Sequence, residues 1–511
     1  PDSPAIAFPV APLARRLTYR QLKEEAELFA GAMAALGVGK GDRVGLLLPN
    51  CPQFVVAWFG LQRLGAVPVG NNPLYTQREL AHQLDDAGVD ILVVLDLLYP
   101  LAGAVRDSVG LKTVIVTKVG DYLGFPINKL APLKQKREAK HEGRSWPPVP
   151  ADAEVTWWSE LMRGSYPEPP PLQVDAVEDV AALVYTGGTT GLSKGAMLTH
   201  HNLVSNALQV GAWFSDVKDG EEAILSILPF FHSYGLSAVM NFAISRAMKL
   251  ILLPRFELEM ALKAIDKEKA TLFPGVPRIY IAINESEETS KYDLSSIRAC
   301  FSGAAPLPVV VAEKFEATTG GRLVEGYGLT ETSPVTHINP AYGKRKFGSI
   351  GLPIPDTDCK IVDLDDPEKE VAQGRDGELC IAGPQVMKGY WNRPEETSDM
   401  IRIHKDGIRW LHTGDIAHVD EEGYFSIVDR KKDMIIVSGF NVYPNEIEQV
   451  VAMHPGVLEC AAIGVPDEHS GEVPKLFIVK KDPALTAQAV IEFCKDKLTG
   501  YKRPKHVEFR T

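Results

Sequence analysis

The sequence predicts an α/β protein. Its large N-terminal domain is expected to have parallel-type sheets covered by helices and a β-rich subdomain, and a small α/β C-terminal domain follows. The chain has 511 residues, which is too long for one hydrophobic core. Helical and strand patterns alternate between residues 17 and 96, as they do when helices cover both faces of a parallel sheet. From 348 to 397 the pattern changes to short strands separated by Gly, Pro and Asp turns, and helical patterns return after 430.

The N-terminal region shows this alternation most clearly. Between 17 and 50, the pattern predicts a helix that begins after Thr18, a Gly-rich stop and a buried strand, VGLLL. A second series of helix, strand, helix and strand follows directly. The Pro-rich stretch YPEPPPLQ, at 166 to 173, is typical of a stiff linker and leads into a further strand, AALVY.

Composition excludes several classes of protein. The net charge of −12 argues against a general nucleic-acid binder, which would present a basic face. The six cysteines are scattered, with no metal-ligand spacing, and this favours a reduced, cytoplasmic compartment. No apolar run is long enough to span a bilayer, and the first residues do not resemble a signal peptide. We expect the chain to be part of a longer gene product.

A Gly- and Thr-rich loop, YTGGTTGLSKG, follows the strand AALVY. The stretch HNLVSNALQVGAWF after it has the spacing of a helix, so the loop is expected to join a strand to a helix. Its glycines let backbone N–H groups approach an oxyanion, and Lys194 adds a positive charge. We therefore predict a phosphate cradle, although the loop alone leaves an ordinary turn open. The cradle residues are Tyr185, Thr186, Gly187, Gly188, Thr189, Thr190, Gly191 and Lys194.

This loop resembles the phosphate-binding signature of the adenylate-forming enzymes, which are acyl-CoA synthetases, adenylation domains of nonribosomal peptide synthetases and luciferases. The stretch GAVPVGNNPLYTQREL is similar to the bacterial long-chain fatty-acid CoA ligases in that superfamily. The resemblance covers essentially the whole chain. It implies an AMP-binding domain with two sheets over 1–429, a β-rich subdomain at about 340–429, and a mobile lid domain over 430–511.

Three further motifs match the superfamily in the N-terminal domain. The segment PFFHSYG resembles the one whose histidine, here His232, lies beside the acyl carboxylate, although a lone buried histidine is more often structural. The turn in IRACFSGAAPLP resembles the place where adenine lies on backbone. In RLVEGYGLTETSP, the resemblance implies that Tyr327 stacks on the purine, Thr330 bonds the α-phosphate, and Glu331 holds Mg²⁺ together with Thr186. The implied nucleotide contacts here are Gly303, Ala304, Ala305, Glu325, Gly326, Tyr327, Gly328 and Thr330.

Further matches lie near the start of the lid domain. Asp415 and Arg430 resemble the residues that bind the ribose hydroxyls, and Lys432 matches the position about which the lid rotates. Gly439 is expected to line the channel for the pantetheine arm of CoA. Ile436 departs from relatives that have lysine there, so no catalytic charge is assigned to it. The superfamily places a further catalytic lysine shortly beyond YKRPKHVEFR, where this chain ends.

Taken together, the motifs predict an ATP-dependent fatty acyl-CoA synthetase. The expected catalytic residues are Lys194, Thr186, His232 and Glu331, and the expected partners are ATP, Mg²⁺, CoA and a fatty acid, with a homo-oligomer left open. An aryl acid as substrate, or a carrier protein as acceptor, is the alternative within the superfamily. A P-loop kinase would release ADP and needs the GxxxxGK[ST] motif, which the cradle lacks. The third alternative, an inactive binding protein, conflicts with the retained Lys194, Glu331 and Asp415.

One basic segment interrupts this acidic chain between 121 and 150. It holds six basic residues, Lys129, Lys134, Lys136, Arg137, Lys140 and Arg144. Charge runs usually face water, and this favours a solvated loop. The alternative is a peripheral contact with the anionic inner face of the cell membrane.

Overall fold

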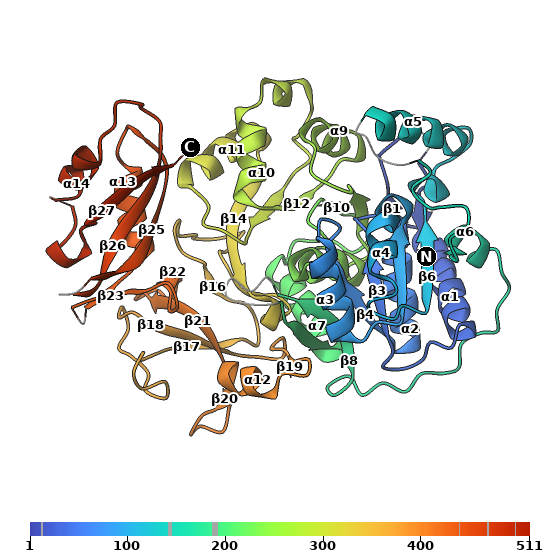
Figure 1. The fold of residues 1–511 in the computed structure, drawn as a ribbon, viewed down its shortest axis with the longest axis horizontal. Helices are drawn as coiled ribbons and strands as arrows, with labels where there is room; N and C mark the ends of the chain where they lie inside the picture. The colour runs from blue at the N-terminus through green and yellow to red at the C-terminus, as the bar shows by residue number, and fades with distance from the viewer. Residues whose placement is uncertain are drawn as a thin grey trace. The chain divides into compact units, whose positions relative to one another are not determined.

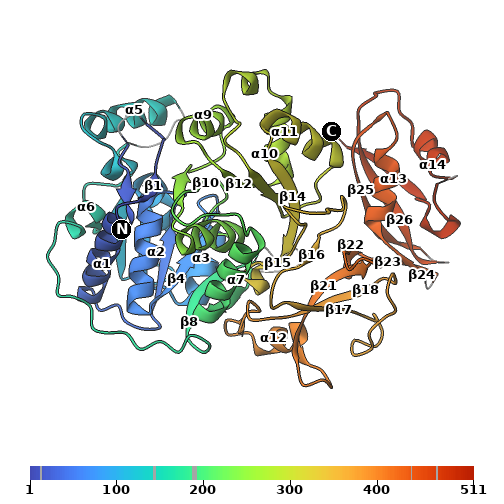
Figure 2. The same cartoon turned by 180° about the vertical axis from the view of Figure 1, so that it is seen from behind.

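The computed structural model describes residues 1–11, 14–141, 146–186, 193–438, 440–467, 470–495 and 497–510 (Figure 1, with the reverse view in Figure 2). The chain divides into two compact units. Unit 1 comprises Pro1–Asp358 and Gly383–Ile401, and unit 2 comprises Cys359–Ala382 and Arg402–Thr511. The α/β fold class, with a large N-terminal and a smaller C-terminal part, is confirmed. The domain boundaries at about 340 and at 429 stay predictions.

Unit 1 contains a sheet with eight strands among the described residues, in the order β19-β9-β8-β4-β3-β5-β6-β7. The strands from β8 to β7 in this order are parallel, and β5 is buried along its whole length because helices cover the sheet. These strands are β3 (Arg43–Leu47), β4 (Val67–Gly70), β5 (Ile91–Leu95), β6 (Thr113–Thr117), β7 (Thr156–Trp157) and β8 (Val180–Tyr185). The helices of this region are α1 (Tyr19–Ala35), α2 (Pro52–Leu64), α3 (Gln77–Ala87), α4 (Tyr99–Val105) and α6 (Trp158–Leu161).

The second sheet of unit 1 has nine strands in the described residues, in the order β16-β15-β14-β13-β12-β10-β11-β1-β2. Its parallel strands are β1 (Pro4–Ala7), β10 (Ala223–Ser226), β11 (Lys249–Leu252), β12 (Leu272–Gly275), β13 (Ala299–Ser302) and β14 (Arg322–Gly328). Antiparallel strands complete the sheet at its two ends, and they are β2 (Leu17–Thr18), β15 (Val335–Ile338) and β16 (Leu352–Pro353). The accompanying helices are α7 (His200–Trp213), η3 (Tyr234–Asn241), α8 (Phe242–Ser245), α9 (Leu258–Glu268), α10 (Pro277–Glu285) and α11 (Val309–Thr319), where η3 is π-helical.

The Thr18 helix start is confirmed. The Thr18 hydroxyl accepts a hydrogen bond from the backbone of Gln21, and the Gln21 side chain accepts one from the backbone of Thr18, which forms a capping box.

The surroundings of the phosphate loop differ from the prediction. The loop does not lead directly into a helix, because β9 (Gly195–Thr199) comes first and pairs antiparallel with β8. The segment GAMLT is too short to show whether its apolar residues belong to a strand or to the helix that follows. Thr199 then caps α7 in a second capping box, with Asn202. The hairpin brings both ends of the loop together, since Tyr185 pairs with Gly195.

The basic segment forms a helix, α5 (Ile127–His141), so the expectation of a solvated loop is wrong in this respect. Its apolar side chains are too sparse for the helical pattern to stand out in the sequence. Figure 1 shows α5 at the surface of unit 1. Across the described residues, no helix has both the length and the apolar character needed to cross a membrane.

Unit 2 holds the remaining sheets. One contains β17 (Asp358–Val362), β18 (Gly377–Ala382), β20 (Ile401–Ile403), β21 (Arg409–Val419) and β22 (Phe425–Arg430). The other contains β23 (Ile435–Val437), β24 (Phe440–Val442), β25 (Val457–Asp467), β26 (Gly471–Lys480) and β27 (His506–Arg510), with helices α13 (Pro444–Ala452) and α14 (Ala487–Lys495). A core of buried aliphatic residues, including Ile447, Val451 and Leu476, joins these helices to the second sheet. Unit 1 ends with β19 (Gly389–Tyr390) and α12 (Pro394–Met400).

Candidate active site

A pocket of about 140 Å³ lies in unit 1 where β13 and β14 end. Small residues follow or interrupt both strands, so backbone and aromatic rings form the walls. Seven of the predicted site residues line this pocket, and they are His232, Gly303, Ala304, Gly326, Tyr327, Gly328 and Thr330. The sequence motifs, which are far apart in the chain, therefore meet at one place. Their individual roles stay predictions.

Aromatic rings fix the geometry of this pocket. The hydroxyl of Tyr234 donates to the backbone oxygen of Phe301, at 2.7 Å. The ring of Tyr327 meets His337 edge-on, with 6.0 Å between the ring centroids. Burial lowers the pKa of His337 to about 3, so its imidazole is neutral at pH 7. The pKa of His232 is also lowered by burial, which favours the neutral imidazole there as well.

Glu331, the predicted metal ligand, is a buried carboxylate in the short helix η5 (Thr330–Thr332). The hydroxyl of Tyr390 donates a hydrogen bond of 2.5 Å to Glu331 Oε1. The Nζ atom of Lys194 lies 5.1 Å from the centroid of the same tyrosine ring, within range of a cation–π interaction. Tyr390 thus contacts both the predicted metal ligand and the predicted phosphate-binding lysine. Sequence reasoning missed it, although it lies in the short motif MKGYWN.

The residues around Glu331 could hold Mg²⁺ only if phosphate oxygens of the substrate supplied further ligands to the ion. No group of three or more His, Cys, Asp or Glu side chains that could hold a metal occurs in the described parts of the chain. Mg²⁺ commonly binds through one or two carboxylates together with substrate phosphates and water. One buried carboxylate, with the Thr186 hydroxyl as the second predicted ligand, agrees with that pattern.

The phosphate loop is held at both ends. The N–H of Thr186 donates to the backbone oxygen of Lys194, at 2.9 Å. Helix α3 contacts both ends of the loop. His82 Nε2 lies 3.3 Å from the backbone oxygen of Ser193, and Asp86 accepts a 2.7 Å hydrogen bond from Tyr185. The remaining predicted cradle residues, Gly187, Gly188, Thr189, Thr190 and Gly191, lie outside the described residues.

Asp86 also accepts a hydrogen bond of 2.5 Å from Arg393, which follows Tyr390 by three residues. Burial and the nearby Asp86 carboxylate raise the pKa of Tyr185, so its hydroxyl stays protonated as a donor. Sequence reasoning missed both Asp86 and Arg393. One carboxylate therefore connects β8, at the start of the phosphate loop, to the segment that carries Tyr390.

Two predicted nucleotide contacts lie at the margin of the pocket. The carboxylate of Glu325 accepts hydrogen bonds from the backbone N–H groups of Leu307, at 2.9 Å, and Gly348, at 3.4 Å. Burial raises the pKa of Glu325. It therefore fixes the turn that follows Gly303. Ala305 is exposed in that turn and is not among the pocket residues.

Unit 2 contains the predicted ribose-binding pair. Asp415 is buried on β21, pairs with Arg430 of β22 in the strand register, and lies 3.2 Å from its Nε atom. The turn before Asp415 is held by Glu378, which accepts hydrogen bonds of 3.1 Å from the N–H of Gly414 and from Lys431 Nζ. Burial of Glu378 acts to raise its pKa, but the hydrogen bonds and charges of His412 and Lys431 have the larger effect. The pKa of Glu378 is therefore lowered to about 2. Lys432 is exposed in the next turn, and Gly439 lies outside the described residues.

Comparison with known proteins places this site in a family. Residues 1–391 match the model of the AMP-binding enzymes, and residues 446–511 match that of the AMP-binding enzyme C-terminal domain. A long-chain-fatty-acid–CoA ligase of Bacillus subtilis is 46% identical over 512 residues, which cover 100% of this chain and 89% of that protein. A long-chain-fatty-acid–CoA ligase of Escherichia coli O157:H7 is 44% identical, over 97% of this chain and 86% of that protein.

Solved structures agree with this. The crystal structure of ATP-bound MatB from Rhodopseudomonas palustris matches with a TM-score of 0.83 and 31% identity, over 100% of this chain and 92% of that one. The chain belongs to the AMP-binding enzyme family, the adenylate-forming superfamily that its motifs predicted. Within that family, it is similar to the bacterial long-chain-fatty-acid–CoA ligases.

Proposed function

We propose that this protein is an ATP-dependent fatty acyl-CoA synthetase, an AMP-forming acid–thiol ligase. The observation that carries the proposal is the contact of Tyr390 with both Glu331 and Lys194, next to the pocket that holds Tyr327 and Thr330. The similarity to long-chain-fatty-acid–CoA ligases supports the choice of acid. A carboxylate is a poor electrophile at neutral pH. It must therefore first become an acyl-adenylate before the thiol of CoA can displace AMP.

The residues of unit 1 are suited to the first half-reaction. Tyr327 offers a ring on which the purine can stack, and Gly303 and Ala304 leave room for it beside the backbone. Lys194 supplies positive charge to the phosphates, and the neutral imidazole of His232 borders the place where the fatty acid carboxylate would enter. Glu331 and Thr186 would hold Mg²⁺, which neutralises phosphate charge when it is bound. Positioning and charge stabilisation of this kind supply most of the rate in phosphoryl chemistry.

Unit 2 supplies the remaining proposed contacts. Asp415 is a carboxylate that Arg430 and the Thr413 turn hold in place, so it is suited to bind the two ribose hydroxyls. We assign the start of lid rotation to the turn that holds Lys432, and the lining of the CoA channel to Gly439. Rotation of a lid between two half-reactions is an established way to exchange one set of catalytic groups for another.

An assay of acid-dependent AMP release tests this function. The enzyme is given ATP, Mg²⁺ and either a fatty or an aryl acid, with and without CoA. We expect AMP and pyrophosphate with fatty acids, and faster turnover with CoA. Preference for an aryl acid, or transfer to a carrier protein but not to CoA, would replace the proposed substrate or acceptor. Release of ADP would show a kinase and overturn the proposal.

We further propose that helix α5 makes a peripheral contact with anionic membranes. Leu130 and Leu133 lie on its surface with 54% and 61% of their area exposed, so these leucines do not contribute to the core. The exposed basic side chains of the same helix are Lys129, Lys136, Arg137 and Lys140. Apolar side chains with basic neighbours are typical of helices that lie in a membrane interface. The side chain of Lys134, and Arg144, lie outside the description.

Vesicle flotation tests this contact. Each basic residue near an anionic surface contributes about 1 kcal/mol to binding. Changing Lys129, Lys136, Arg137 and Lys140 to Gln should therefore abolish flotation with phosphatidylglycerol vesicles. A matched variant with Lys263, Lys267, Lys291 and Lys314 changed to Gln loses the same charge elsewhere in unit 1 and should still float. Equal flotation of both variants, or flotation that salt does not weaken, would contradict the proposal.

A further inference from the structure

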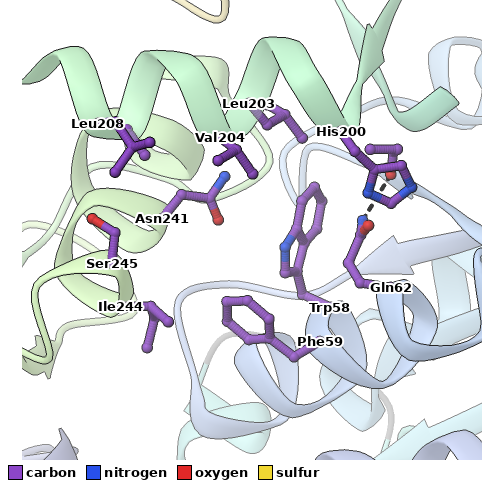
Figure 3. Close-up of a pocket in the computed structure, with 12 residues that line it drawn as sticks. Trp58, Phe59, Gln62, His200, Leu203, Val204, Leu208, Asn241, Ile244 and Ser245 are labelled. Atoms are coloured by element: carbon purple, nitrogen blue, oxygen red, sulfur yellow. Dashed lines mark hydrogen bonds between the residues drawn. The ribbon is translucent and has the colours of Figure 1, made fainter. Parts of the chain in front are cut away.

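A second cavity in unit 1 is separate from the pocket described above. Its volume is about 290 Å³, and it lies between helices α2, α7 and α8. Figure 3 shows Trp58 and Phe59 of α2 facing Leu203 and Val204 of α7. The drawn side chains extend from His200 and Gln62 at one end to Ile244 and Ser245 at the other. We call this cavity the helical bay.

The walls of the helical bay are mainly apolar. Trp58 and Leu203 are buried. Val204 and Leu208 lie one turn apart on α7 and are 59% and 57% exposed. Apolar residues that line a cavity and remain exposed together are typical of a binding site, whereas scattered ones are not. The volume equals that of about ten water molecules, and a saturated chain of about eight to ten carbon atoms would fill it.

Polar groups are few in the helical bay, and two of them are available to a ligand. Gln62 donates to the backbone oxygen of Ala181, and Ser245 donates to that of Phe242. Within the described residues, the side chains of His200 and Asn241 are not paired in a hydrogen bond, although Asp179 and Lys40 lie close enough to His200 to act on its charge. The site therefore offers a long apolar wall with an imidazole at one end. This pattern matches an aliphatic chain with one polar end.

We infer that the helical bay is a second acyl-chain site, which binds a free fatty acid with its carboxylate at His200. The ligand class rests on the proposed function, because a fatty acid synthetase works in the presence of this amphiphile. No described residue of the phosphate loop, and no residue of the nucleotide pocket, lines the helical bay. The bound chain is therefore not the molecule that is activated.

The helical bay and the candidate active site are lined by different residues, some of which lie in the same helical segment. The helical segment from 234 to 245 begins with Tyr234 in the nucleotide pocket and ends with Ile244 and Ser245 in the bay. The rings of Trp58 and Phe54 are 6.4 Å apart, and those of Phe54 and Phe230 are 5.6 Å apart, which leads to the loop that holds His232. On the other side of α7, Asn206 bonds the backbone of Val335, which lines the nucleotide pocket. A chain bound in the bay thus contacts elements that position the site.

Calorimetry with the reaction pocket blocked tests the inference. The enzyme is first saturated with a non-hydrolysable sulfamoyl analogue of decanoyl-AMP and is then titrated with decanoate. A ligand of this size binds with a Kd of roughly 0.1 to 10 mM. We expect one further equivalent of decanoate to bind the wild type. Leu208→Glu should weaken this second event at least tenfold, because it places a charge in the apolar wall. The matched control is Val310→Glu on α11, which also places a charge on an exposed aliphatic residue and should leave binding unchanged.

A spectroscopic measurement locates the ligand. A brominated decanoate should quench the fluorescence of the blocked enzyme, and Trp58→Phe should remove most of that quenching. Absence of a second equivalent, or equal binding by Leu208→Glu and Val310→Glu, would overturn the inference. So would a change of oligomeric state in Leu208→Glu by sedimentation, which would make this surface an interface between copies. If the adenylate analogue itself fails to bind, the proposed function fails, while quenching through Trp58 still reports on the helical bay.

Discussion

The hydroxyl of Tyr390 donates a 2.5 Å hydrogen bond to the carboxylate of Glu331, and the two residues are 59 positions apart in the sequence. Strand β19 makes this contact possible, because Tyr390 pairs with Ala196 of β9, next to Gly195 at the end of the phosphate loop. The side chain of Tyr390 thus contacts both the predicted metal ligand, Glu331, and Lys194 of the predicted phosphate loop. We expect Tyr390 to act as a positioning residue for both.

Tyr390→Phe should slow acyl-AMP formation by about 10- to 100-fold, because a hydrogen bond to a charged group contributes about 1.5–3 kcal/mol. The variant keeps the ring beside Lys194, so only the orientation of Glu331 changes. We expect a higher Mg²⁺ concentration for half-maximal pyrophosphate release, which a purely structural role would not produce.

The matched control for Tyr390 is Tyr122→Phe. Tyr122 is buried, its hydroxyl donates to the carboxylate of Glu25, and neither residue belongs to the predicted site. Both variants should lose a similar amount of stability in urea unfolding. An unchanged Mg²⁺ dependence in Tyr390→Phe, or an equal change in Tyr122→Phe, would count against the positioning role.

Glu331→Gln should reduce acyl-AMP formation by about 10²- to 10³-fold, the usual cost of removing one group that stabilises developing charge. Glutamine keeps the shape of the side chain and can still accept from Tyr390. The melting temperature should therefore stay close to that of the wild type. Conversion of supplied acyl-AMP and CoA to acyl-CoA should be less affected. Wild-type rates of pyrophosphate release would remove Glu331 from the mechanism.

Sequence motifs predicted most of the pocket because its residues lie where strands end. Gly303 follows β13, and Tyr327 lies at the end of β14, which pairs with β13. Neighbouring strands bring these ends together whatever the detailed packing. The Thr18 cap and the α/β alternation were predicted correctly because each depends on a few residues that are adjacent in the sequence.

The supporting contacts could not be predicted in this way. Asp86 is 99 residues from Tyr185 and 307 residues from Arg393, and no local pattern relates them. Strand β9 was missed because its five residues continue directly into the apolar pattern of α7. The helical bay could not be predicted either, because its residues come from helices and a strand that are separated in the sequence.

His337 should make the stability of the protein depend on pH. Its pKa is about 3 when folded, against an ordinary value of about 6.5, so the unfolded chain binds more protons between these values. The free energy of unfolding should therefore fall as the pH decreases, by about 2 kcal/mol between pH 7 and pH 5 from this residue. His337→Asn should lower stability at pH 7 but flatten the pH dependence. Urea unfolding of both proteins at the two pH values measures this, and parallel losses would assign the acid sensitivity to other groups.

Asp415→Asn should raise the KM for ATP by about 10- to 100-fold and leave kcat nearly unchanged. Ribose contacts are present in both the ground state and the transition state, so their loss weakens binding uniformly. The size follows from losing a charged acceptor, which contributes about 1.5–3 kcal/mol. Arg430→Gln should have a smaller effect in the same direction, because it removes one ion-pair partner of Asp415 and keeps the carboxylate itself.

The control for Asp415 lies nearby in unit 2. Asp376 accepts from His418 at 3.1 Å, and its side chain is 39% exposed, against 4% for that of Asp415. Exposed pairs of this kind contribute little to stability, about 0–1 kcal/mol. Asp376→Asn should therefore leave both KM and kcat close to their wild-type values. Initial rates over a range of ATP concentrations, at saturating fatty acid and CoA, separate the two parameters. A fall in kcat with an unchanged KM for Asp415→Asn would mean that this carboxylate acts on the reacting groups and not on the ribose.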